Sequence, residues 1–377
     1  MKSHLPHFMA ITVILTLVFP SCRKEIVWNW KQGTPMPKEK MKIAFIHPND
    51  IDSDSLYDHA HYMGTLQMQK NIGLEDSQII RKVNVFEADP AMVEGAMRDS
   101  IAEGANFIIA MSWGYMDTCE KLAPEFPSVL FAHINGYKYN ERNFTSCSVR
   151  LYQVRYLSGI VAGMKTKTGK IGYVAAMGSD NSEVTAGINA FAIGVEEVNP
   201  EARILVRVTY SWYDPMGETD AANALIAYGC DVLAAHCNTP APQIAAQRAG
   251  VWAIGFNSDM SANAPDAVIT SVFPRWDVLY TRLAGNIING SFSPAIRFFG
   301  LADGMVGMTP INETLAAPGT EAAVQAARQR IMDGFNVFDG LLETNTGKII
   351  GEEGKTLSGD VIRNYIDWYY RNVVVIR

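Results

Sequence analysis

Aromatic side chains stand beside carboxylates or amides at several places along the 377-residue chain. A ring of this kind stacks on a flat ligand, while neighbouring carboxylates and amides bond the ligand's edges. Taken singly, Tyr57, Trp113 or Trp212 fits a core or rim aromatic equally well, but several such groups together indicate a cleft for a planar molecule. The candidate ligand-binding residues are Asp54, Tyr57, Trp113, Tyr115, Asp117, Trp212, Asn238 and Asp259.

These residues follow short apolar runs, which are typical of strands covered on both faces. Helical patterns separate the runs, and the alternation predicts an α/β fold with parallel sheets and right-handed crossovers. Ligands of such sheets lie beyond the carboxyl ends of the strands. The expected strands are 42–47, 81–86, 107–111, 128–134, 170–175, 203–209, 232–236, 252–256 and 267–271, and the expected helices are 55–71, 91–103, 153–166, 182–198, 218–228, 239–249 and 276–289.

The two sets of strands, in residues 41–150 and 151–271, each have the size of one doubly wound unit, and together they suggest two lobes of one binding protein. A net charge of −7 without a basic cluster argues against a nucleic-acid partner. Beyond the first twenty residues, the absence of a long apolar run excludes a polytopic membrane protein.

The N-terminus has the features of a bacterial lipoprotein signal. A basic start precedes an apolar stretch at 8–19, which is too short to span a bilayer and ends just before Cys22. We expect residues 1–21 to be removed, Cys22 to be acylated, and residues 22–40 to act as a tether. An ordinary cleaved signal peptide that leaves Cys22 free is the alternative. The lipid anchor would place the protein in the cell envelope, on a membrane, facing the periplasm or the exterior.

The four remaining cysteines are expected to stay reduced. Cys230 and Cys237 lie at opposite ends of one expected strand, too far apart to pair. Cys119 and Cys147 are expected to be buried free thiols, although the sequence leaves their pairing open.

Enzyme and metal chemistry find little support in the sequence. His59 and His61 are two apart on an expected helix and point to different sides, so they do not easily bind one metal together. The series Asp50, Asp52, Asp54 departs from a calcium loop, since serine and histidine occupy its glycine and terminal glutamate positions. No G-x-S-x-G elbow or phosphate-binding glycine motif is present. We therefore expect no catalysis, cofactor or metal.

Seven short motifs occur in a characteristic order: Ser112–Asp117, Arg155–Gly159 with Gly163, Gly187–Phe191, Trp212–Pro215, His236–Pro242, Gly255–Met260, and Gly304–Gly307 followed by Pro310. In this order they resemble the basic membrane protein (BMP, PnrA-like) family of ABC-transporter substrate-binding proteins, over about residues 41–368. The resemblance implies a type I periplasmic-binding fold, in which two doubly wound parallel-sheet lobes are joined by a three-segment hinge. It also implies a purine nucleobase or nucleoside that is held between the lobes and delivered to an ABC permease.

The resemblance assigns roles to individual residues. Ring stacking falls on Tyr57, Trp113 and Trp212, and bonds to a ring edge or a sugar fall on Asp54, Asn238 and Asp259. Tyr115 and Asp117 share the motif of Trp113 and are also expected at the ligand.

Two departures from the family bear on the ligand. Pro274 stands where nucleoside-binding relatives have a lysine that holds the ribose, and Arg275 follows it. The first loop has Leu56 and Tyr57 in place of the usual glycine-rich form with a tryptophan. Both departures favour a free base such as adenine, guanine or hypoxanthine over a nucleoside.

The expected lobes are 41–150 with 275–300, and 151–272 with 303–377, joined near 148–152, 271–276 and 299–303. We expect a monomer whose partners are the purine, the permease and, through the lipid anchor, the membrane. A surface lipoprotein that senses a purine or acts as an adhesin without transport is the alternative, and a purine-processing hydrolase comes third.

Overall fold

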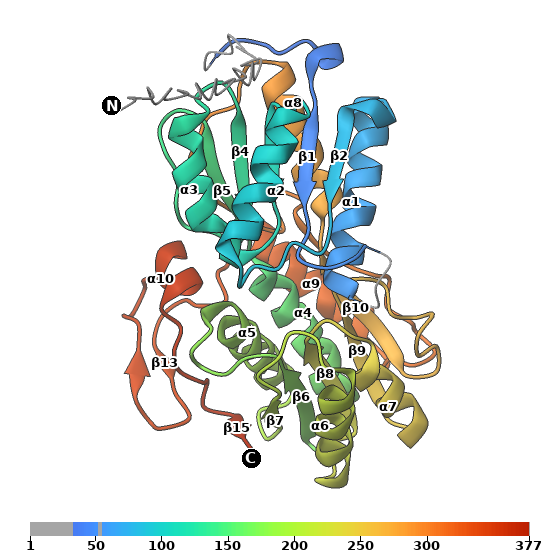
Figure 1. The fold of residues 1–377 in the computed structure, drawn as a ribbon. Coiled ribbons are helices and arrows are strands. Elements are labelled where there is room, and N and C mark those ends of the chain that lie inside the picture. The colour runs from blue at the N-terminus through green and yellow to red at the C-terminus, as the bar shows by residue number, and fades with distance from the viewer. Residues whose placement is uncertain (1–32, 52–54, 377) are drawn as a thin grey trace, which may run out of the picture.

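Two separate β-sheets form the centre of the computed structural model, which describes residues 33–51 and 55–376 (Figure 1). We call the six-stranded sheet with its helices lobe 1, and the seven-stranded sheet with its helices lobe 2. Within these two sheets the strands pair in parallel, except for β10 with β12. The α/β fold class expected from the sequence is confirmed.

Lobe 1 has helices on both faces of its sheet. On β1, Ile43 and Phe45 pack with residues of α1 and α8, whereas Ala44 and Ile46 pack with residues of α2 and α3. This explains the continuous apolar run, because neither face of the strand meets water. The strand order is β11 (Ile296–Phe299), β5 (Phe144–Val149), β4 (Leu130–Ile134), β3 (Phe107–Ala110), β1 (Ile43–Ile46), β2 (Ile79–Lys82), and the helices are α1 (Leu56–Ile72), α2 (Pro90–Ala102), α3 (Met116–Glu125) and α8 (Trp276–Ile288).

Lobe 2 repeats this plan and adds C-terminal elements. Its helices α4 and α5 cross at backbone contact, because a β-carbon on Gly159 would overlap the Phe191 carbonyl, and one on Gly194 would overlap that of Tyr156. The strand order is β12 (Val306–Met308), β10 (Val268–Pro274), β9 (Trp252–Phe256), β8 (Val232–His236), β6 (Lys170–Ala175), β7 (Arg203–Val208), β15 (Val373–Val375). The other elements are α4 (Leu151–Lys165), α5 (Ser182–Val198), α6 (Pro215–Ala227), α7 (Ala241–Ala249), α9 (Thr320–Met332), β13 (Leu342–Glu343), β14 (Ile349–Ile350) and α10 (Gly359–Asn364).

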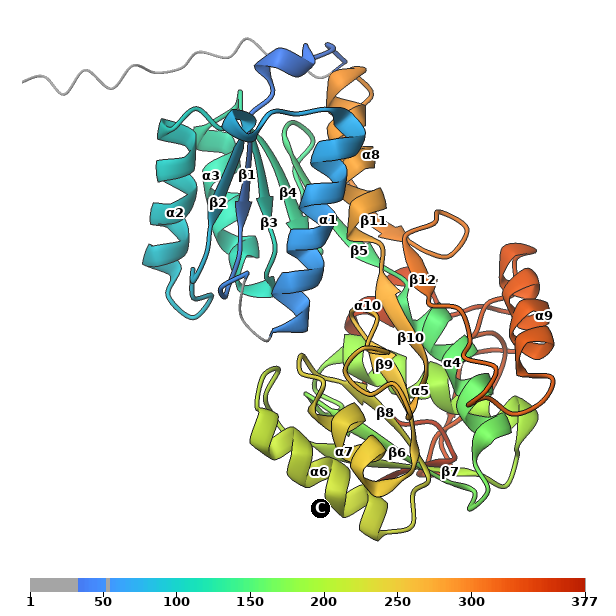
Figure 2. The ribbon, with the colours of Figure 1, turned by 90° about the vertical axis from the view of Figure 1, so that its right-hand side faces the viewer.

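The chain passes between the two sheets at three places, from β5 to α4, from β10 to α8, and from β11 to β12 (Figure 2). Backbone hydrogen bonds tie these crossings to one another. The Arg150 N–H donates to the Phe299 carbonyl at 2.6 Å, and the Arg275 N–H donates to the Met305 carbonyl at 2.8 Å. The crossings therefore form one hydrogen-bonded hinge.

Some elements differ from the sequence-based expectation. The strand expected at 81–86 ends at Lys82, because Asn84 takes a left-handed conformation with φ of 55°. Strand β5 and helix α3 were not expected, since Thr145, Ser146 and Ser148 interrupt the apolar pattern of β5 and Pro124 lies inside α3.

The end of the expected tether is also docked rather than free. Met36 is buried against lobe 1, and its N–H donates to the Ile287 carbonyl at 3.1 Å. The polar composition of residues 22–40 gave no sign of this contact, which depends on the single apolar side chain of Met36.

The signal peptide and Cys22 lie outside the described residues. Within the described part of the chain, no helix has both the length and the apolar character needed to cross a membrane. The four cysteines at 119, 147, 230 and 237 are buried and free, as expected from the sequence.

Candidate ligand-binding site

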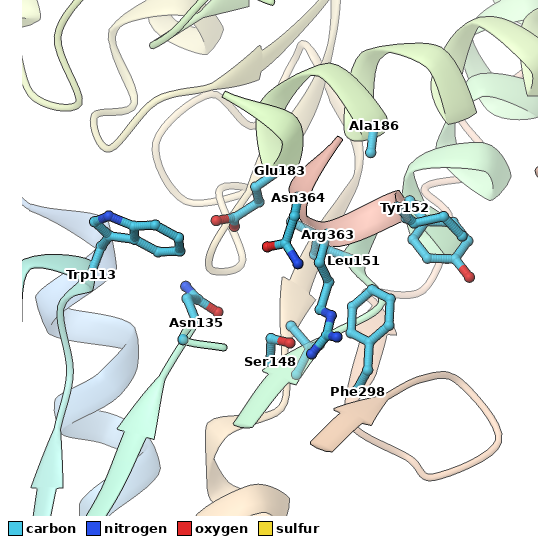
Figure 3. A pocket seen from close by; sticks show the side chains of 13 residues that line it. Trp113, Asn135, Ser148, Leu151, Tyr152, Glu183, Ala186, Phe298, Arg363 and Asn364 are labelled. Carbon is cyan, nitrogen blue, oxygen red and sulfur yellow. The ribbon is translucent and has the colours of Figure 1, made fainter. Parts of the chain in front are cut away.

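A pocket lies between the lobes at the hinge, where the strands of lobe 1 end (Figure 3). Its volume of about 60 Å³ is several times the roughly 10–15 Å³ that one water requires. Both lobes, the hinge and the C-terminal segment contribute to it. Its lining consists of Trp113, Asn135, Gly136, Ser148, Val149, Leu151, Tyr152, Glu183, Ala186, Phe298, Ile362, Arg363 and Asn364.

Trp113 forms the aromatic wall of the pocket. It begins a short 3₁₀ turn soon after β3, the residue is 54% exposed, and its ring packs against that of Tyr137 with 5.5 Å between ring centroids. Glu87 fixes the turn by accepting hydrogen bonds from the Ser112 hydroxyl and, at 3.0 Å, from the Gly114 N–H. The indole is therefore a positioned but accessible stacking surface.

Asn135 brings an amide to the pocket from the end of β4. Its φ of 65° lies in the left-handed region, which asparagine tolerates better than most residues, and its N–H donates to the Cys147 carbonyl at 2.8 Å. Asn257, at the end of β9 in lobe 2, has a φ of 66°. The side-chain amide of Asn257 is used internally, since it donates to the Asn238 side chain at 3.0 Å.

Glu183 is the acidic group of the pocket and lies in the first turn of α5, which Asn181 caps by accepting from the Val184 N–H at 3.1 Å. Glu183 is exposed at the mouth of the cleft, and desolvation by the protein around it raises the pKa of its carboxyl to about 7. The charge of the fully buried Arg155 opposes this shift. Glu183 therefore changes charge near neutral pH.

Arg363 and Asn364 reach the pocket from α10, far along the chain. The Arg363 guanidinium lies 5.4 Å from the centroid of the Phe298 ring, and Arg150 lies 5.3 Å from the same centroid. No sequence pattern indicated these residues or Glu183 as pocket groups. A Ser-Gly-Asp start marks α10 as a helix, but nothing local indicates where it docks.

Among the residues expected at the ligand, Trp113 lines the pocket, whereas Tyr57 of α1 does not. The Tyr57 hydroxyl donates to the Met111 carbonyl at 2.6 Å, and its ring meets the edge of His61 at 4.3 Å. Burial raises the Tyr57 pKa well above its usual range. Asp54 lies outside the described residues.

Tyr115 and Asp117 are not brought to the pocket. Tyr115, expected at the ligand, is fully buried in this structure and donates its hydroxyl to the Val85 carbonyl, so it faces the core and not the pocket. The 3₁₀ turn directs it into the core of lobe 1, away from Trp113. Asp117 is exposed and pairs with Lys138 at 2.8 Å on the surface of α3.

Trp212, Asn238 and Asp259 gather on lobe 2, after β7, β8 and β9, but do not line the pocket. The half-buried Trp212 meets His236 edge to face with 6.1 Å between ring centroids, and its carbonyl accepts from the Asn238 N–H at 2.8 Å. Asp259 is exposed and accepts from the Ser261 N–H at 2.9 Å. Across the cleft, the Asn238 carbonyl accepts from the Leu56 N–H of lobe 1 at 2.9 Å.

The described residues contain no group of three or more histidine, cysteine, aspartate or glutamate side chains placed to hold a metal ion. The pocket instead offers an indole, amides, a hydroxyl, a carboxylate and a guanidinium. These groups bind a ligand by stacking and hydrogen bonding.

Two doubly wound lobes, three hinge crossings and a pocket between the lobes define a ligand-binding protein of the type that closes around its ligand. The chain belongs to the family described as ABC transporter substrate-binding protein PnrA-like (Bmp), which residues 40–338 match. The family resemblance expected from the sequence motifs is confirmed.

Relatives by sequence include the purine-binding protein BAB2_0673 of Brucella abortus (strain 2308), 31% identical over 84% of this chain and 88% of the relative. The putative ABC transporter glucose-binding protein TsgA13 of Haloferax volcanii is 29% identical over 82% of this chain and 76% of the relative.

Solved structures of solute-binding proteins share the fold. An ABC transporter solute-binding protein from Conexibacter woesei DSM 14684 has a TM-score of 0.66 at 23% identity, covering 78% of this chain and 97% of its own. One from Aeropyrum pernix K1 has a TM-score of 0.66 at 18% identity, covering 78% of this chain and 92% of its own. The type I periplasmic-binding fold is thus confirmed.

Proposed function

We propose that the protein binds a purine, the free base in preference to the nucleoside, and delivers it to the permease of an ABC importer. The half-exposed indole of Trp113, at the wall of a pocket with polar groups from both lobes, carries this proposal. Indole stacks on a flat heteroaromatic ring, and the polar groups match the donors and acceptors of a purine edge. The relative named purine-binding supports it.

The preference for a base rests on the hinge sequence. Pro274 carries no cation to hold a ribose, and it ends β10. The guanidinium of Arg275 is engaged by Asp277 through contacts of 2.9 and 2.8 Å along the start of α8. Neither residue supplies a free positive charge to the cleft.

Trp212, Asn238 and Asp259 remain proposed ligand contacts in a more closed form. They follow the carboxyl ends of β7, β8 and β9 in lobe 2, and the backbone of Asn238 already contacts lobe 1 through the Leu56 N–H. A ligand that bonds groups of both lobes favours closure by the difference between its affinities for the closed and open forms. The permease then distinguishes loaded from empty protein.

Calorimetric titration with hypoxanthine, adenine, their nucleosides and glucose tests the ligand. We expect a base to bind at about micromolar affinity or better, and its nucleoside at least about tenfold more weakly. Equal or reversed affinities contradict the base preference. Binding of glucose alone would overturn the purine proposal in favour of the sugar named for the Haloferax relative. Nucleosides recovered intact after incubation would exclude hydrolysis.

We also propose that Cys22 carries the lipid anchor. Fractionation of cells that express the Cys22→Ser variant tests this, since the variant should leave the membrane fraction while the parent remains in it. A variant that stays with the membrane would contradict lipid attachment at Cys22.

A further inference from the structure

The C-terminal segment builds one wall of the pocket and lies beyond the part of the chain that matches the family. Three hydrogen bonds secure it along α5: from the Ile366 N–H to the Ser182 hydroxyl at 3.1 Å, from the Tyr370 N–H to the Asn189 side chain at 2.8 Å, and from the Asn189 amide to the Trp368 carbonyl at 2.7 Å. The Ser182 bond is adjacent to Glu183. The segment therefore holds α10 in a fixed position beside the pocket.

Arg363 is the basic group that this wall brings to the pocket (Figure 3). Its side chain is only 14% exposed, its Nε donates to the Gly359 carbonyl at 3.1 Å, and its contact with Asp360 is long at 3.5 Å. Among the described residues its Nη1 is buried without a hydrogen-bond partner. A buried guanidinium N–H is costly to leave unpaired, and the Arg363 side chain, which lines the pocket, therefore keeps unused hydrogen-bonding capacity that a small turn of the guanidinium would bring to an acceptor.

Donor and acceptor are thus placed on different walls of one pocket, with Arg363 on α10 and Glu183 on α5. A 6-oxopurine presents acceptors at O6 and N7 and a donor at N1, whereas adenine presents an amino donor in place of O6. Guanidinium pairs well with the O6 and N7 acceptors and meets only a donor at the 6-position of adenine.

We propose that Arg363 makes this site select 6-oxopurines, such as hypoxanthine and guanine, over adenine. This inference rests on the proposed function, since it names which purine the same pocket prefers. The Arg363 guanidinium bonds the O6 and N7 edge, and Glu183 accepts from N1–H. The residue that carries this preference lies on α10, beyond residues 40–338 that match the family model.

Titration of hypoxanthine and adenine against the parent, Arg363→Met and Arg150→Met tests the proposal. The parent should prefer hypoxanthine by about 10- to 100-fold, the discrimination expected of a guanidinium–base pair. Arg363→Met should bring the two affinities to within about threefold of each other. Arg150→Met removes a cation from the same Phe298 ring without lining the pocket, so the preference should persist.

Two further measurements keep the test independent of folding. Arg363→Lys retains a charged donor for O6 without the planar fork, so its preference should lie between those of the parent and Arg363→Met. With the parent protein alone, 7-deazahypoxanthine should bind about tenfold more weakly than hypoxanthine, because it lacks N7.

The outcomes separate the two proposals. If the parent binds neither base, the proposed function fails. If it binds adenine as tightly as hypoxanthine, or if Arg363→Met keeps the preference, only the selection by Arg363 is overturned.

Discussion

The charge of Glu183 allows ligand binding in the pocket to be tested by a change of pH. Loss of water in the cleft raises its pKa to about 7, whereas an ordinary glutamate is ionised far below neutral pH. The ionised form accepts a stronger, charge-assisted hydrogen bond from a ring N–H than the protonated form does. We therefore predict that purine affinity rises as the pH rises through 7 and levels off above about 8.

The expected magnitude follows from this pKa. With a value of about 7, about 9% of the carboxyl groups are ionised at pH 6 and about 91% at pH 8. If binding requires the charged form, the association constant rises about tenfold over this interval.

The other titratable groups near the pocket do not change charge between pH 6 and 8, so they do not add to the expected change in affinity. Burial lowers the pKa of His133 to about 4 and that of His236 well below its usual value, so both stay neutral. Burial raises the pKa of Tyr57, which also stays neutral. Arg155 and Arg363 remain charged throughout, as guanidinium groups do in proteins.

Calorimetry with hypoxanthine at pH 6, 7 and 8 measures the effect in the parent and in Glu183→Gln. The parent should gain about tenfold in affinity, and the variant should change by less than about twofold. Asp180→Asn is the matched control, because Asp180 lies just before α5 and does not line the pocket. A flat parent profile, or an equal slope in Glu183→Gln, would refute the assignment of Glu183 as acceptor.

Three further substitutions test the pocket and the fold. Trp113→Ala should weaken purine binding by about 5- to 100-fold in calorimetry while it melts close to the parent, and an unchanged affinity would place the ligand elsewhere. Gly159→Ala should lower the free energy of unfolding, measured by urea denaturation, by about 1–3 kcal/mol, because the added methyl group forces α4 away from α5. The control Gly95→Ala, with open space around it, should be neutral or slightly stabilising. Tyr115→Phe should cost about 1 kcal/mol of stability and leave purine affinity unaltered, and a large loss of affinity would contradict its core position.

The strand ends were predictable because each apolar run must stop where the chain meets solvent, and polar or aromatic residues mark that point. The sequence did not predict whether a residue after the strand faces the solvent or the core. Trp113 and Tyr115 are two residues apart in one short turn, yet the first is half exposed and the second fully buried. The spacing of the two residues does not decide which one is buried. That depends on the conformation of the turn, which Glu87 fixes from another loop.

The far wall of the pocket was beyond sequence reasoning for a different reason. Glu183 and Arg363 are 180 residues apart, and their proximity to one pocket depends on how the C-terminal segment packs along α5. Such packing leaves no periodic pattern in the sequence around Arg363. The Trp113 motif, by contrast, is contiguous and identifies the lobe 1 wall directly.

The asparagines in left-handed conformation at the ends of β4 and β9 occupy equivalent places, because the two sheets share the order of their first five strands. The two lobes are thus built on one strand order. The two asparagines differ in their contacts, since the Asn257 amide donates to the Asn238 side chain, whereas Asn135 lines the pocket. A planar ligand bound in this pocket would therefore meet two lobes that share a strand order but offer it different polar groups.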